Sequence, residues 1–136
     1  MNTETKGLLS STVSHLPSGK YWVTDPCYVY PESEWSDYCD NCDEGMKEYD
    51  GVAFFNWGTA YGDGSYELKM GREVMGECGV DAGLLAIIPV GLVAKWGKRT
   101  DKELSDLGVL IELPEPTEVH EASGDVKFGK FSLKTR

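Results

Sequence analysis

The sequence predicts a mostly β (α+β) fold, a small single-domain barrel or sandwich with one or two short helices. Short runs rich in aromatic and β-branched residues recur along the chain, and Gly or Pro bounds them. Helical periodicity appears in few places. With 136 residues, of which 40% are hydrophobic, the chain has the size and composition of one folded domain.

The first predicted strands lie in the N-terminal half. Residues 20–24 and 52–57 are rich in aromatic and β-branched side chains, which favour strands. Residues 61–66 read Tyr-Gly-Asp-Gly-Ser-Tyr and predict a hairpin, because Gly62 and Gly64 can adopt the positive φ of a tight turn.

The C-terminal half contains the strongest strand signal. Residues 84–88 are apolar at every position, so both faces are expected to be buried, as in a central strand. Residues 107–113 repeat this character more weakly. Residues 118–122 and 125–128 alternate polar and apolar side chains, which predicts a terminal hairpin that residues 131–133 extend.

Two segments favour short helices. Residues 31–40 begin with Pro and acids, as helix N-termini prefer. The spacing i, i+3, i+4, i+7 predicts an aromatic and sulfur face opposite an acidic one, made of Trp35, Tyr38, Cys39 and Cys42. A second helix is expected over residues 89–95, with Pro89 in its first turn.

The domain boundaries follow from composition. Residues 1–14 are expected to be a flexible N-terminal tail, and residues 15–136 a single β-rich domain. The start lacks the pattern of a signal peptide. The longest apolar stretch, residues 82–94, is shorter than the roughly 18 residues of a membrane span and is interrupted by Gly and Pro. We therefore expect a soluble, cytoplasmic protein without a membrane partner.

Charge narrows the class of partner. The formal net charge is -10, which argues against nucleic-acid binding, because that function needs clustered Lys and Arg. Residues 32–50 hold eight acids against Lys47, whereas residues 127–136 hold four bases and no acid. This asymmetry predicts two electrostatic faces. The alternative is that both are ordinary solvated surface.

The run at residues 21–30, Tyr-Trp-Val-Thr-Asp-Pro-Cys-Tyr-Val-Tyr, places an acid, a thiol and aromatic rings where a strand ends. Asp25 precedes a proline and is favoured as a turn cap through its own side chain. The alternative is an acid whose pKa is shifted by burial. His15 and His120 stand in no nucleophile motif, so no catalytic residue is predicted and a non-enzymatic role is favoured.

The cysteines leave two interpretations open. Cys39 and Cys42 form a C-x-x-C pair, and Cys27 and Cys78 complete the four ligands of a closed zinc site. Zinc modules that are recognisable from sequence have a second ligand pair, which this chain lacks. Buried small hydrophobic cysteines are therefore the favoured interpretation, and no cofactor is predicted apart from the zinc alternative.

A spaced set of motifs gives the chain a resemblance. Its elements are Gly-x-Tyr-x-Val-x-Asp-Pro-Cys-Tyr at 19–28, Gly-Asp-Gly-x-Tyr at 62–66 and Val-Asp-Ala-Gly-Leu at 80–84, together with Trp35, Cys39, Ile88-Pro89 and Leu92-Val93. Over residues 19–95 the chain resembles small uncharacterised proteins of phages and bacteria. The resemblance implies a compact β-rich domain, often phage-encoded, and carries no assigned catalytic residue.

Three functions are compatible with these features. The first is a non-enzymatic, phage-type accessory protein in the host cytoplasm, which binds a host protein through an acidic and aromatic surface; its residues are Glu32, Glu34, Trp35, Asp37 and Tyr38. The second is a small-ligand protein that holds a nucleotide-like molecule in an aromatic pocket made of Tyr21, Trp22, Asp25, Tyr28, Trp57, Tyr61 and Tyr66. The third is a virion component.

Overall fold

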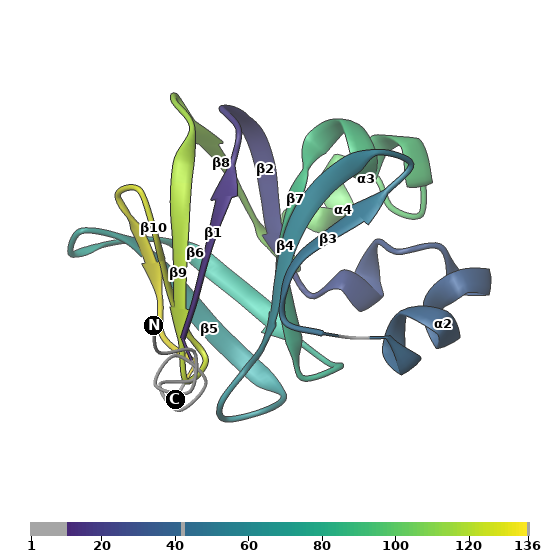
Figure 1. The fold of residues 1–136 in the computed structure, drawn as a ribbon, viewed down its shortest axis with the longest axis horizontal. Helices are drawn as coiled ribbons and strands as arrows, with labels where there is room; N and C mark the ends of the chain where they lie inside the picture. Colours follow the sequence, from purple (N-terminus) through teal and green to yellow (C-terminus); the bar gives the residue numbers. More distant parts are fainter. Residues whose placement is uncertain (1–10, 42, 136) are drawn as a thin grey trace, which may run out of the picture.

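The computed structural model describes residues 11–41 and 43–135. The described residues form two antiparallel sheets packed face to face (Figure 1). The sheets are not closed into a barrel, so the small β-rich domain is a sandwich.

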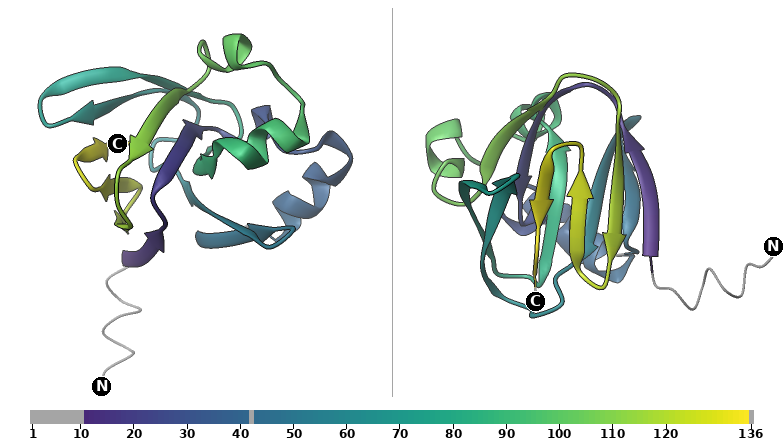
Figure 2. Two further views of the ribbon diagram at one scale, coloured as in Figure 1. Left: turned by 90° about the horizontal axis from the view of Figure 1, so that it is seen from above. Right: turned by 90° about the vertical axis from the view of Figure 1, so that its left-hand side faces the viewer.

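One sheet has six strands. In spatial order these are β1 (Ser11–Leu16), β9 (Thr117–Ala122), β10 (Asp125–Phe128), β11 (Phe131–Leu133), β5 (Gly64–Met70) and β6 (Glu73–Val80). The right-hand view of Figure 2 shows this sheet from its outer side. The other sheet has five strands, which are β3 (Gly45–Tyr49), β4 (Val52–Gly58), β7 (Leu84–Pro89), β2 (Gly19–Thr24) and β8 (Val109–Leu113).

Short helical segments cover the outer face of the five-stranded sheet (Figure 1). They are η1 (Pro26–Tyr28), η2 (Glu32–Glu34), α2 (Trp35–Asp40), α3 (Val90–Trp96) and α4 (Asp101–Leu104). Both predicted α-helices are present, and α4 is a third. Thr100 and Glu103 form a capping box that starts α4. In the part of the chain that the structure describes, no helix has the length and apolar character to cross a membrane.

The five-stranded sheet is buried on both faces. Tyr21, Trp57 and Ile87 point between the two sheets, whereas Trp22 and Ile88 point under the helices. Neighbouring residues of a strand face opposite sides, so one strand serves both cores. Strand β7 pairs with β2 and β4, which confirms that the apolar run at residues 84–88 is a central strand.

Two predictions about local structure were wrong. Residues 11–14 belong to β1, which pairs with β9 along its whole length. The tail expected over residues 1–14 therefore overlaps a strand, and residues 1–10 lie outside the described residues.

Residues 61–66 are not a hairpin, because the chain crosses there from β4 in one sheet to β5 in the other. Backbone N–H of Tyr61 donates to Thr135 O at 2.7 Å and fixes this crossing.

Candidate functional site

Asp25 lies at the end of β2 and is fully buried. Its Oδ1 accepts the backbone N–H of Cys27 at 2.9 Å and caps η1, which confirms the predicted turn cap. Its Oδ2 accepts the backbone N–H groups of Asp81 and Ala82, each at 2.8 Å. Burial raises the pKa of Asp25, and the three amide donors oppose that rise. The carboxylate is therefore used to join two turns.

Tyr28 strengthens the same junction. Its hydroxyl donates to Asp81 Oδ2 at 3.0 Å, and burial together with the Asp81 charge raises the pKa of Tyr28. Arg99 Nε donates to Tyr28 O at 2.9 Å, with the guanidinium 5.6 Å from the ring centroid. The Asp-Pro-Cys-Tyr and Val-Asp-Ala-Gly elements thus meet in space and bind each other.

Lys98 fixes the segment that follows this junction. Its Nζ donates to the carbonyl oxygens of Cys27 at 3.1 Å and Tyr30 at 3.2 Å. The same ammonium forms an ion pair with Glu32 Oε1 at 2.9 Å. Lys98 and Arg99 were not predicted as site residues from the sequence. Their adjacency in the sequence was the available signal, but nothing local linked them to a loop about 70 positions away.

We call residues 32–50 the acidic segment. It comprises η2, α2 and β3, and Figure 1 shows α2 on the side of the five-stranded sheet that faces away from the six-stranded sheet. Aromatic rings hold it there. Tyr30 lies 4.6 Å from Tyr38 and 5.5 Å from Tyr49 between ring centroids, and Trp35 stacks on Tyr38 at 5.0 Å. Such ring pairs stabilise a surface element beyond their apolar burial.

Tyr38 is internal, which corrects its expected role as an exposed anchor. Only 3% of its surface is exposed, because its ring packs against other aromatic rings and its hydroxyl donates to Asn56 Oδ1 at 2.8 Å. Lys47 Nζ lies 4.8 Å from the Tyr38 ring centroid and donates to Asn41 O at 2.8 Å. Tyr38 therefore fastens the acidic segment to the sheet. Trp35 is half-buried and packs against the same cluster.

The acids of the segment fall into two groups. Four have partners: Glu32 pairs with Lys98, Asp50 pairs with Lys95 at 2.8 Å, Glu34 Oε2 accepts the Tyr49 hydroxyl at 2.8 Å, and Glu44 Oε2 accepts the backbone N–H of Gly58 at 2.7 Å. Other carboxylates are exposed and make no side-chain hydrogen bond or ion pair with any residue of 11–41 or 43–135; these are Asp37, Asp40, Asp43 and Glu48. Lys47 donates to Asn41 O and pairs with none of these four carboxylates, so their charge is uncompensated. The segment thus presents negative charge on a fixed frame.

The residues of the expected aromatic pocket do not line one cavity. Tyr21, Trp57 and Tyr66 fill the core between the sheets, whereas Trp22 lies in the other core. Tyr61 is 78% exposed. Asp25 and Tyr28 are taken up by the junction with Asp81. The alternation of side chains along β2 separates Tyr21 from Trp22, so the predicted pocket is not formed.

The cysteines are dispersed. Cys78 is buried, and its Sγ donates to Val23 O at 3.4 Å; burial raises the pKa of Cys78 to about 12. Cys27 is half-buried, and burial followed by the Asp25 charge raises its pKa. Cys39 is exposed on the short helix α2, not on its inner face as expected, and Cys42 lies outside the described residues. Among the described residues no three potential ligands gather, so the structure does not support the zinc interpretation.

Comparison of the chain with protein-family models, curated proteins and solved structures found no match. The candidate site is therefore defined by its own geometry: the acidic segment, fixed by an aromatic cluster and Lys98.

Proposed function

We propose that this protein is a non-enzymatic accessory protein that binds another protein through the acidic segment. The observation that carries this proposal is the group of exposed, uncompensated carboxylates on a rigidly held surface element, namely Asp37, Asp40, Asp43 and Glu48. The residues that first suggested chemistry are used for folding: Asp25 caps two turns, and Cys78 packs in the core.

The physical basis is electrostatic steering by a preorganised surface. Negative charge on one side of a molecule accelerates encounter with a basic partner. Because Lys98 and the aromatic cluster already order the segment, binding costs less conformational entropy than for a disordered acidic tail. Half-buried Trp35 offers an aromatic contact of the kind enriched at interfaces.

The kind of partner follows from charge and from the sequence resemblance. A chain with net charge -10 suits a basic or neutral protein surface. The resemblance over residues 19–95 favours a phage-type protein, whose partner is a host protein in the host cytoplasm.

The test compares two variants that remove the same number of charges. In the segment variant, Asp37→Asn, Asp40→Asn, Asp43→Asn and Glu48→Gln remove four negative charges without shortening the side chains. The control variant changes exposed acids elsewhere, through Glu73→Gln, Asp106→Asn, Glu112→Gln and Glu115→Gln. Each tagged protein is used to isolate partners from bacterial lysate, and bound proteins are quantified by mass spectrometry.

We expect a protein that the unchanged chain and the control variant retain and that the segment variant loses. Added salt should weaken its retention, because exposed charges are screened beyond about 10 Å at 0.1 M ionic strength. Equal retention by both variants would contradict the proposal. Thermal unfolding of both variants establishes that they are folded.

A further inference from the structure

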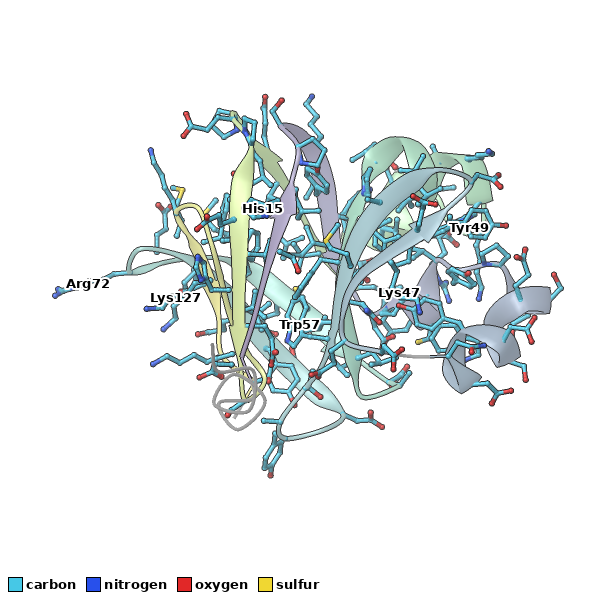
Figure 3. All side chains as sticks on the ribbon, in the orientation of Figure 1. His15, Lys47, Tyr49, Trp57, Arg72 and Lys127 are labelled. Carbon is cyan, nitrogen blue, oxygen red and sulfur yellow. The ribbon has the colours of Figure 1, made fainter. Side chains whose placement is uncertain are left out.

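The outer face of the six-stranded sheet carries a concavity of about 820 Å³. It extends across β5, β6, β10 and β11, and its polar side chains alternate with buried residues such as Leu68 and Val126. This face lies on the opposite side of the sandwich from the acidic segment. In Figure 3, Lys127 and Arg72 are on this side, and Tyr49 is on the other.

Strand register brings two lysines beside one serine. Lys127 of β10 is directly opposite Ser132 of β11, and Ser132 is directly opposite Lys69 of β5. Directly opposite residues project from the same face, with Cβ atoms about 5 Å apart. Lys134 is two positions after Ser132 and also lines the concavity. A hydroxyl therefore lies between ammonium groups on the neighbouring strands.

The groups that remain uncommitted in this concavity are hydrogen-bond donors. Within the described ranges, Lys127, Ser132 and Lys134 have no side-chain hydrogen bond or ion pair. Lys69 differs from them, because it forms an ion pair at 4.0 Å with Glu67, an acid of the same concavity.

The acids of the concavity are already engaged. Glu77 accepts the Ser65 hydroxyl at 3.0 Å, and Asp125 accepts the backbone N–H of Thr135 at 3.1 Å. A ligand that fits the uncommitted donors must supply acceptors, and carboxylates bind ammonium groups through charge-assisted hydrogen bonds.

We propose that this concave face binds an acidic polypeptide segment of a partner protein. The donors are spread over three strands and the concavity far exceeds one small anion, which favours a chain bearing several carboxylates. Tyr61, 78% exposed at the same concavity, adds an aromatic contact. The site is distinct from the acidic segment and selects the opposite charge, so it gives the protein two binding faces.

The net charge makes the test stringent. A molecule of net charge -10 repels an acidic peptide at long range, so binding of such a peptide reports local contacts. The probe is a fluorescein-labelled decaglutamate peptide, and its binding is measured by fluorescence anisotropy. Lys127→Glu is compared with Lys102→Glu, which makes the same charge change at an exposed position of α4.

We expect saturable binding to the unchanged protein and to Lys102→Glu, and a loss of about tenfold or more for Lys127→Glu, since one charge-assisted contact exceeds the 1.4 kcal/mol of a tenfold change. No binding below about 1 mM peptide, or equal weakening by both substitutions, would overturn the proposal.

Displacement of the peptide by equimolar inorganic phosphate would assign the face to a small anion and would also overturn the proposal. Self-association that Lys127→Glu abolishes would assign it to a second copy, with the same consequence. The segment variant and its control variant each remove four negative charges, so they weaken the long-range repulsion of the peptide equally and should bind it alike. Failure of one proposal is therefore distinguishable from failure of the other.

Discussion

The Asp25 carboxylate accepts a hydrogen bond from the backbone N–H of Ala82 at 2.8 Å, although the two residues are 57 positions apart. This contact ties the end of β2 to the turn between β6 and β7. It explains why the Asp-Pro-Cys-Tyr and Val-Asp-Ala-Gly elements occur together in one chain: each supplies half of one buried hydrogen-bonded junction.

Removing the Asp25 side chain should destabilise the fold severely. Asp25→Ala deprives the N–H groups of Cys27, Asp81 and Ala82 of their acceptor, and a buried donor left without a partner costs about 1–3 kcal/mol. We expect the free energy of unfolding to fall by about 3 kcal/mol or more, measured by urea denaturation. Asp106→Ala, at an exposed position, should change it by less than about 0.5 kcal/mol. Similar losses in both variants would refute the junction.

Glu121 should make stability depend on pH. The side chain is buried, and Oε2 accepts the backbone N–H of Gly124 at 2.9 Å. Burial raises its pKa, the Gly124 bond opposes this, and the charges of Glu44 and Asp125 add to the rise. The folded protein therefore binds more protons than the unfolded chain above about pH 4.3, and stability falls as pH rises through the folded pKa.

The variant Glu121→Gln keeps an acceptor for Gly124 but cannot ionise. We expect it to be more stable than the unchanged protein near neutral pH, with the difference shrinking as pH approaches about 4. Thermal unfolding across this pH range measures the difference. A difference that is constant with pH, or that grows in acid, would show that Glu121 does not titrate in this way.

The Tyr38 hydroxyl should contribute to holding the acidic segment. Tyr38→Phe removes its hydrogen bond to Asn56 Oδ1 and should lower the free energy of unfolding by about 1 kcal/mol. Tyr61→Phe makes the same chemical change at a residue that is 78% exposed and should have no measurable effect. Urea denaturation of Tyr38→Phe and Tyr61→Phe measures both changes in the free energy of unfolding. Equal changes would mean that the buried hydroxyl does not contribute to stability.

The cysteines should differ widely in reactivity. Alkylation requires the thiolate and access to it, so exposed Cys39 should react with iodoacetamide first. Half-buried Cys27, with its raised pKa, should follow, and Cys78 should react only when the protein unfolds. Mass spectrometry of digested protein gives the order. Protection of Cys39 that a chelator removes would instead indicate a metal site.

Sequence patterns predicted elements whose signal is local. The unbroken apolar run at residues 84–88 identified β7, because a strand buried on both faces needs apolar side chains at each position. Strand β1 escaped prediction, because Ser-Thr-Val-Ser-His-Leu is largely polar and lies at a sheet edge. The capping box of α4 was present in the sequence, but its single turn left no periodicity to detect.

The candidate site was predictable in composition but not in geometry. The acids of residues 32–50 were evident from the sequence. Which of them have partners depends on the fold, since Lys98 and Tyr49 reach Glu32 and Glu34 only after folding. The predicted strand at residues 20–24 already implied that Tyr21 and Trp22 face opposite sides. The folded sheet adds that both sides are buried cores, which leaves no shared pocket.

Photo-crosslinking from position 40 tests whether the acidic segment contacts a partner protein. Asp40 is exposed on α2, and a benzoylphenylalanine there would lie within the proposed contact surface; the same residue at exposed position 115, outside the acidic segment, is the control. We expect a discrete crosslinked partner from position 40 in illuminated bacterial cells and none from position 115. Crosslinking of the same partner from both positions, or from neither, would contradict it.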